Sequence, residues 1–145
     1  MIYISHRGNI YGKQPDKENS IVYIEEALKK YYVEIDVWKK GECLFLGHDN
    51  PKYLVDSEFI YTNRKKLLCH AKNIQALTYL HGRNIHCFWH NEDEYTITSK
   101  GLIIALPSKW NEQTICMLPE TYDLKYEEIK NCVGICSDKI GEYFD

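Results

Sequence analysis

The chain lacks the excess of basic residues that nucleic-acid-binding proteins carry. Its 145 residues contain 18 Lys and Arg against 21 Asp and Glu, which gives a formal net charge of −3. Without a positive field over the whole molecule, an anionic ligand has to be held by a local site. The short basic run at 64–66 is typical of a solvated face, so we expect no nucleic-acid partner.

Long apolar runs are also absent from the sequence. The longest, "GLIIALP" at 101–107, is far too short to cross a bilayer. Residues 1–20 contain no apolar core of the length that a secretory signal needs. We therefore expect a cytoplasmic protein without a transmembrane segment.

The cysteines lack the spacing of a structural zinc site, because no two of them form a CxxC pair. Without an export signal they are expected to be reduced thiols packed in strands. They are Cys43, Cys69, Cys87, Cys116, Cys132 and Cys136.

What the sequence does contain is a succession of short segments with the composition of β-strands. They are rich in β-branched, aromatic or cysteine residues, and most end near Gly, Pro, Asn or Asp. Several are almost continuously apolar, as in sheets that are covered on both faces. The segments lie at 2–5, 33–38, 43–48, 67–72, 85–89, 101–106, 114–118 and 133–137.

Helical periodicity separates some of these strands. Residues 18–31 place apolar side chains on one face after Asn19 or Ser20 as N-cap. Residues 73–81 repeat the pattern after Asn73. Two weaker helix candidates lie at 56–66 and 122–131.

The alternation of strands and helices predicts an α/β fold with parallel strands. Eight strands would fit a closed (β/α) barrel, although such barrels usually need about 250 residues. Late connections such as 107–113 are too short for crossover helices. We therefore expect residues 1–145 to form a single domain, a shortened and helix-depleted (β/α) TIM-like barrel with mostly parallel strands.

Two carboxylates in the second predicted strand indicate a metal site. Glu34 and Asp36 share one face of the strand, about 6 to 7 Å apart, and repel each other unless positive charge lies between them. A hard divalent cation supplies that charge. A solvated edge strand, or carboxylates paired with lysines, would explain the same pattern. The apolar neighbours Val33, Ile35 and Val37 favour the metal site.

Other predicted strands also end in side chains that suit phosphate chemistry. The first ends in His6 and Arg7, a proton carrier beside a fixed positive charge, and Gly8 turns the chain. The third ends in His48 and Asp49.

The fourth predicted strand places His70 and Lys72 on one face. His86 and His90 flank the next strand, where a lone histidine is more often a hydrogen-bonded packing residue than a reactive one. The polar and aromatic segment 88–101 fits either a loop over a pocket or a solvated hairpin.

Together these motifs resemble those of the glycerophosphodiester phosphodiesterase family, within the phosphatidylinositol-specific phospholipase C-like superfamily of barrels. The family pattern runs from HRG through a helix-starting PEN-T/S element and E-x-D-V to an HD, followed by E-x-K and a GIITD-like strand. The likeness covers the first 50 residues well and continues as scattered strand matches. The corresponding stretches are "HRG" at 6–8, "KENS" at 17–20, "EIDV" at 34–37, "GHD" at 47–49, "HAK" at 70–72 and "VGICSD" at 133–138.

The resemblance implies acid–base catalysis by two histidines, His6 and His48. One removes a proton from the attacking hydroxyl, and the other protonates the leaving alkoxide. It further implies that Arg7 and Lys72 bind the phosphate of the substrate. Glu18 would support the site by bracing Arg7 or by capping its helix.

The metal site that the resemblance implies consists of Glu34, Asp36 and His70, and His70 stands where the family has a carboxylate. Oxygen ligands favour Mg²⁺ or Ca²⁺, whereas a nitrogen ligand shifts the preference toward Mn²⁺ or Zn²⁺. Asp49 would orient His48 or lie at the edge of the metal.

The expected activity is therefore metal-assisted hydrolysis of a glycerophosphodiester-like or related small phosphodiester, in lipid metabolism. The first alternative is a catalytically weak or inactive module on the same fold that binds a phosphate or a lipid headgroup. Other rivals are a nuclease or lyase acting on a different phosphodiester, and a structural or interaction protein. No oligomeric state follows from the sequence.

Overall fold

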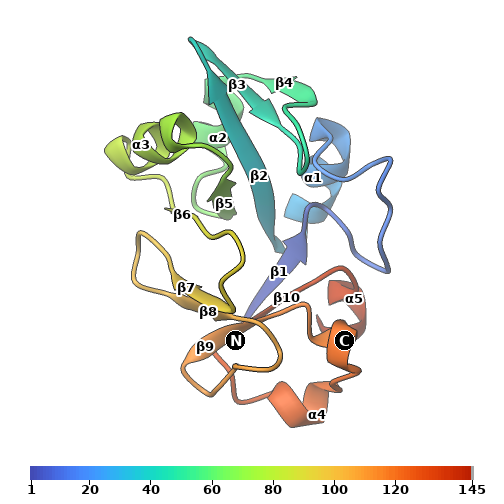
Figure 1. The fold of residues 1–145 in the computed structure, drawn as a ribbon. Helices are drawn as coiled ribbons and strands as arrows, with labels where there is room; N and C mark the ends of the chain where they lie inside the picture. Colours follow the sequence, from blue (N-terminus) through green and yellow to red (C-terminus); the bar gives the residue numbers. More distant parts are fainter. Residues whose placement is uncertain (145) are drawn as a thin grey trace.

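A mixed β-sheet organises the chain, which the computed structural model describes over residues 1–144 (Figure 1). Its strands are β1 (Ile2–His6), β2 (Tyr32–Lys40), β3 (Cys43–Leu46), β4 (Tyr53–Val55), β5 (Leu67–Ala71), β6 (Cys87–Phe88), β7 (Tyr95–Ile97), β8 (Ile103–Ala105), β9 (Thr114–Met117) and β10 (Gly134–Ser137). Its helices are α1 (Ile21–Leu28), α2 (Ser57–Thr62), α3 (Ile74–Gly82), α4 (Tyr126–Ile129), α5 (Ile140–Phe144) and the 3-10 helix η1 (Pro119–Tyr122). None of these helices has the length and hydropathy needed to cross a membrane.

The N-terminal strand β1 lies near the middle of the sheet and connects its two halves. β1 pairs in parallel with β2 on one side and with β10 on the other. From β10 the parallel pairing continues through β9 to β8, and from β2 it continues through β5 to β6. β2 pairs with β1 near its start and with β3 near its end, so it joins the curved sheet to the β3–β4 hairpin (Figure 1).

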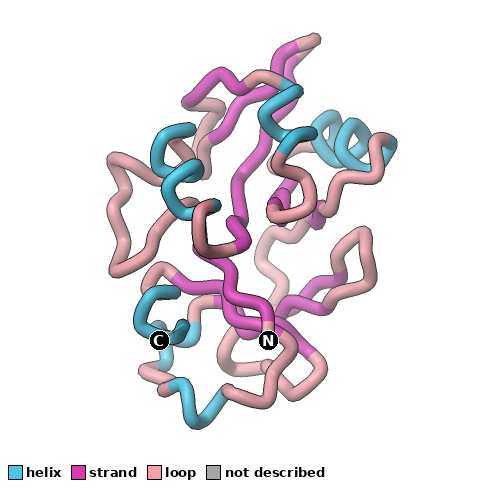
Figure 2. Tube along the Cα trace, turned by 180° about the vertical axis from the view of Figure 1, so that it is seen from behind, coloured by secondary structure: helices cyan, strands magenta, loops and turns pink. Residues whose placement is uncertain are grey.

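The expected TIM-like barrel with mostly parallel strands is wrong. The sheet is mixed, because β3 runs antiparallel to β2, β4 to β3, and β7 to β8. It forms a half-barrel, whose open arrangement Figure 2 shows from behind. Over residues 1–144 no strand ladder joins β6 to β7 or β8. Short connections explain the difference, since turns such as 41–42 and 98–102 reverse the chain where a parallel neighbour would require a crossover helix.

The two ends of the half-barrel, at β6 and at the β7–β8 hairpin, are joined by individual hydrogen bonds and not by a strand ladder. The Ser99 N–H donates to the Cys87 carbonyl at 2.8 Å, and the Cys87 N–H donates to Ser99 Oγ at 2.9 Å. His86 Nε2 lies 2.6 Å from Thr98 Oγ1 in the same seam. The segment 88–101 thus contains the first strand and the turn of the β7–β8 hairpin, and its end lies beside β6.

All eight predicted strand segments overlap observed strands. The N-cap predicted for α3 is confirmed, because Asn73 Oδ1 accepts a hydrogen bond from a main-chain N–H of the first turn at 2.9 Å. The N-cap of α1 is Ser20, and Asn19 precedes it in a left-handed conformation with φ 66°. The candidates 56–66 and 122–131 shrink to α2 and α4, and no sequence pattern indicated β4 or α5. β7 lies in the segment 88–101, for which a solvated hairpin was one of the two interpretations.

Alternation along β2 separates the hydrophobic core from the polar interior of the half-barrel. Val33, Ile35 and Val37 belong to a core cluster that also contains residues of α1 and α3. Glu34 and Asp36 alternate with them and therefore point to the opposite, concave face of the sheet. The packing of the helices on the outer face thus fixes which side chains face the interior.

Candidate active site

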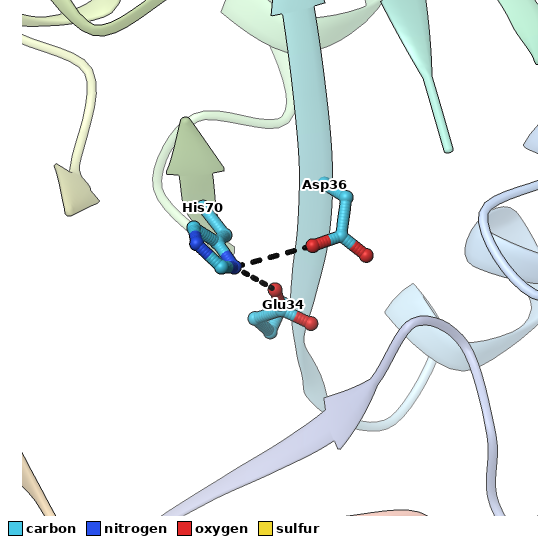
Figure 3. A group of neighbouring side chains, drawn as sticks. All are labelled: Glu34, Asp36 and His70. Carbon is cyan, nitrogen blue, oxygen red and sulfur yellow. Dashed lines mark ion pairs between the residues drawn. The ribbon is translucent and has the colours of Figure 1, made fainter. Parts of the chain in front are cut away.

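β2 and β5 bring two carboxylates and an imidazole together on the concave face of the sheet (Figure 3). The strand pairing sets Asp36 beside His70, and Glu34 lies two residues earlier on the same face of β2. His70 Nδ1 lies 3.3 Å from Asp36 Oδ1 and 3.9 Å from Glu34 Oε1. One ligand atom from each residue falls within 4.8 Å of the others, so the three expected metal ligands lie together.

This donor set fits a divalent cation. Glu34 Oε2 and Asp36 Oδ1 are buried and have no hydrogen-bond partner among the described residues, and such oxygens are uncommon unless something else satisfies them. His70 Nε2 lies 3.3 Å from the His90 carbonyl oxygen, which only accepts. Nε2 therefore carries a proton, and Nδ1 faces the two carboxylates. Two carboxylates with one imidazole suit Mn²⁺ or Zn²⁺ as well as Mg²⁺.

The two carboxyl groups differ in how readily they ionise. Burial, together with the charge of Asp36, raises the pKa of Glu34 to about 7. Burial also opposes ionisation of Asp36, but the His70 ring in its charged form, with a proton on Nδ1 as well, and the charge of Arg7 outweigh burial and hold the pKa of Asp36 well below its ordinary value. Two carboxylates this close seldom both ionise freely. As the pH falls, Glu34 is the one that takes up a proton first.

The loop between β1 and α1, residues 7–20, holds Asp36 from one side through Asn19 and Arg7, and we call these contacts the Asp36 clamp. Asn19 Nδ2 donates to Asp36 Oδ2 at 2.9 Å, and the Asp36 N–H donates to Asn19 Oδ1 at 3.0 Å. Arg7 Nε lies 3.0 Å from Asp36 Oδ2, while Arg7 Nη1 donates to Glu18 Oε1 at 3.1 Å. Glu18 therefore braces Arg7, one of its two expected roles. Asn19 was expected only as a helix cap, and no local signal marks its contact with Asp36.

The HRG turn brings Arg7 to Asp36 through an uncommon backbone conformation. Arg7 has φ 58° and Gly8 has φ 94°, a region that residues with a Cβ seldom adopt. A Cβ on Gly8 would lie 2.6 Å from Tyr23 Cδ2 of α1, so the turn passes too close to the helix for any side chain. The glycine thus determines the path along which Arg7 reaches the site.

His6 is buried at the end of β1 between two acidic side chains. Its Nδ1 lies 2.7 Å from Asp138 Oδ1, and its Nε2 lies 3.7 Å from Glu34 Oε2. Burial opposes protonation, but the hydrogen bond with Asp138 and the charge of Glu34 outweigh it and raise the pKa of His6. Sequence reasoning assigned no role to Asp138, although it ends the "VGICSD" stretch on which the family resemblance partly rests.

His48 lies in the loop after β3 and is the more accessible of the two expected catalytic histidines. Its side chain is 45% exposed, and its Nδ1 lies 2.8 Å from Asp49 Oδ1. Partial burial and the charge of Arg7 lower the pKa of His48. Asp49 contacts His48 and does not belong to the group around His70, which favours its orienting role over a place at the metal.

One cavity of about 590 Å³ unites most of the expected site residues. Asp36 and Glu18 lie behind its wall, where both contact Arg7. The residues that line it include His6, Arg7, Glu34, His48, His70 and Lys72. Both expected catalytic histidines and the two expected phosphate-binding cations therefore border one space.

Aromatic rings form another part of the cavity wall. Phe88 and His90 stack on His70, with ring centroids 4.7 and 4.8 Å away. Trp89 also lines the cavity and is 50% exposed. Part of the segment 88–101 therefore borders the pocket, and its later part forms the exposed strand β7 of the β7–β8 hairpin, so the structure combines the two expected arrangements. His86 is engaged in the seam with Thr98, in agreement with its expected packing role.

Comparison with known proteins gave no match: no family model, no curated protein and no solved structure is significantly similar to this chain. The resemblance to the glycerophosphodiester phosphodiesterase family therefore rests on the motif residues alone. The convergence of these residues on one cavity is an observation independent of that resemblance.

Proposed function

We propose that this chain is a metal-assisted phosphodiester hydrolase that acts on a glycerophosphodiester-like or related small phosphodiester. One observation carries the proposal: His6 and His48 line the same cavity as Glu34 and His70 of the cation site. Cleavage of a phosphodiester requires a proton acceptor, a proton donor and positive charge near the phosphoryl oxygens. The cavity offers all three.

Positive charge at the substrate phosphate comes from two sources. Glu34, Asp36 and His70 would hold a divalent cation, which when bound stabilises negative charge on the phosphoryl oxygens. Lys72 lines the cavity and adds a compact charge. Arg7 is committed to two carboxylates, so it positions Asp36 and offers only its remaining N–H groups to a phosphate.

The two histidines divide the proton transfers according to their exposure. His48, the accessible one, takes the proton of the attacking hydroxyl, which belongs to water or to the substrate's own alcohol. His6, buried and hydrogen-bonded, gives a proton to the leaving alkoxide as the P–O bond breaks. One histidine gains the proton that the other loses, and exchange with solvent restores both.

The proposed reaction belongs in the cytoplasm and involves no nucleic acid. Six cysteines are free thiols in the described chain, and five of them are buried, which suits a reducing compartment. The excess of acidic over basic residues disfavours binding to a polyanion.

Hydrolysis assays with single-histidine variants test this function. Metal-depleted protein is assayed on glycerophosphodiesters with added Mg²⁺, Ca²⁺, Mn²⁺ or Zn²⁺, or with chelator. We expect metal-dependent activity that falls by about 100-fold or more in His6→Ala and in His48→Ala. His81→Ala, on the exposed last turn of α3, is the matched control and retains full activity. Intact activity in both site variants would show that the two-histidine mechanism is wrong.

The second candidate is a phosphate-binding or headgroup-binding module without turnover. The observation that favours it is His70, which replaces a carboxylate that the family resemblance leads us to expect. Calorimetric titration with inorganic phosphate in the presence of Mn²⁺ separates the two cases. Phosphate binding that depends on Lys72, together with no hydrolysis of any tested diester, would support the module and contradict the hydrolase.

A further inference from the structure

The C-terminal part of the chain supplies a partner for His6 that is 132 positions away in sequence. Asp138 directly follows β10, and β10 runs parallel to β1 with Ser5 opposite Ser137. This register carries Asp138 alongside His6, where Asp138 Oδ1 lies 2.7 Å from His6 Nδ1. The contact is therefore a product of the sheet order and not of a flexible surface pairing.

Asp138 is itself held in place by neighbouring groups. Its Oδ1 accepts a second hydrogen bond from Asn9 Nδ2 at 2.8 Å, and its main-chain N–H donates to Glu120 Oε1 at 2.8 Å. Glu120 Oε2 in turn accepts from Ser137 Oγ at 2.9 Å. Asp138 is only 8% exposed and Asn9 is fully buried, so the carboxylate has little freedom to turn away.

The chemistry of this contact determines which nitrogen of His6 carries the proton. An ionised carboxylate only accepts hydrogen bonds, so Nδ1 of His6 has to donate. In the neutral ring the other nitrogen, Nε2, is then left without a hydrogen, and Nε2 is the atom on the side of Glu34 in the cavity. We infer that Asp138 is a positioning residue that fixes the Nδ1–H tautomer and the orientation of His6, so that Nε2 faces the site.

This role is the same as that of a carboxylate that orients a catalytic imidazole and stabilises its charged form. The consequence for turnover rests on the proposed function, in which His6 gives a proton to the leaving alkoxide. The charged ring carries a hydrogen on both nitrogens, Nε2–H is the one that the alkoxide takes, and the Nδ1–H tautomer is the form that remains. The tautomer of His6 does not rest on the proposed function. It can be measured whether or not the protein hydrolyses a phosphodiester.

Nitrogen NMR of the histidine side chains tests the tautomer directly. In protein labelled with ¹⁵N-histidine and held at a pH where the ring is neutral, His6 should show a protonated Nδ1, an unprotonated Nε2 and a downfield Nδ1 proton. Asp138→Ala should move the ring toward the Nε2–H tautomer. Asp138→Asn keeps an acceptor oxygen, so it should retain the tautomer and lose the downfield shift. Asp123→Asn, which removes an exposed carboxylate, is the control and leaves the His6 signals unchanged.

The positioning role of Asp138 and its effect on turnover can be overturned separately. An Nε2–H tautomer in the unaltered protein, or His6 signals that do not respond to Asp138→Ala, would overturn the positioning role whether or not the protein is active. If the protein does hydrolyse a diester, Asp138→Ala should lower kcat by about 100-fold or more and change KM less than about 3-fold. An unchanged kcat in a variant whose tautomer has shifted would overturn the catalytic consequence. Absence of hydrolysis in the unaltered protein counts against the proposed function alone.

Discussion

His70 Nδ1 points at Asp36 Oδ1 across the β2–β5 pairing, at a distance of 3.3 Å. The contact places a nitrogen atom where the family resemblance leads us to expect a carboxylate oxygen. A third carboxylate would add negative charge and favour hard cations, whereas an imidazole is neutral when it binds a metal and is a softer ligand. The metal preference of the proposed cation site therefore depends on this position.

We predict that His70→Asp moves the metal preference toward Mg²⁺ and Ca²⁺. Titration calorimetry of the metal-free protein should show Mn²⁺ or Zn²⁺ binding more tightly than Mg²⁺, and the variant should reduce that ratio by about 10-fold or more. His81→Asp, on the exposed end of α3, is the control and should leave every affinity unchanged. A variant with the metal ratio of the unaltered protein would show that His70 is not a ligand.

Glu34 makes the metal-free protein less stable as the pH rises. Its pKa is about 7 in the folded chain against an ordinary 4.5, so between these values the folded state holds a proton that the unfolded state releases. This contribution is fully present below about pH 4.5 and is lost as the pH rises through about 7. We predict that Glu34→Gln removes the loss and stabilises the metal-free protein at about pH 8, by on the order of 3 kcal/mol.

Urea unfolding at about pH 5 and about pH 8 measures the effect of Glu34→Gln as a difference between the two conditions. Glu25→Gln, which removes an exposed carboxylate from α1, is the control and should give the same small change at both. If Glu34→Gln changed the free energy of unfolding equally at the two pH values, the buried carboxyl would have an ordinary pKa.

Asn19 is predicted to stabilise the fold through the Asp36 clamp. Asn19→Ala removes both hydrogen bonds to Asp36, leaves buried polar groups without partners, and should lower the free energy of unfolding by about 2 to 4 kcal/mol. Asn19→Gly distinguishes the effect of the lost side-chain hydrogen bonds from the effect of backbone strain, because glycine accepts the positive φ at this position and still lacks the side chain. Both variants should therefore be destabilised, with Ala the worse. A Gly variant as stable as the unaltered protein would assign the role of Asn19 to its backbone alone.

The site was predictable where a local pattern determines it, and β2 is the example. Period-two alternation along the sequence is enough to place Glu34 and Asp36 on one face, whichever strands lie beside β2. Their partners come from elsewhere: Asn19 lies 17 positions from Asp36, and Asp138 lies 132 positions from His6. These contacts depend on which strands pair and in what register, and no local pattern encodes that.

The absence of pairing information in local sequence patterns also explains why the predicted closed barrel is wrong. Strand composition identified β3 and β8 correctly but contains no information on strand direction, which the length of each connection decides. The exposed strand β7 has no continuous apolar signal, so no strand was assigned within 88–101, although a solvated hairpin was one interpretation of that segment, and the sheet was expected to close. The convergence of the site residues survived this error, because it depends mainly on β1, β2 and β5 and on the loop after β3.

Gly8 provides a last test of how the HRG turn is built. Gly8→Ala combines a strained φ of 94° with a Cβ placed 2.6 Å from Tyr23 Cδ2, and should lower the free energy of unfolding by about 2 to 4 kcal/mol. Gly41→Ala, in the β2–β3 turn, has φ 58° and nothing within 4 Å of the added Cβ, so it isolates backbone strain and should cost only about 1 kcal/mol.

A double-mutant cycle separates the steric clash at Gly8 from the strain. Tyr23→Ala removes the ring atoms that the new Cβ would meet, so the double variant Gly8→Ala, Tyr23→Ala should recover about 1 kcal/mol or more relative to the sum of the single changes. Additive effects would mean that the turn shifts away from α1 without cost. In that case the glycine would serve the backbone conformation of the turn, and its close approach to the helix would not constrain Arg7.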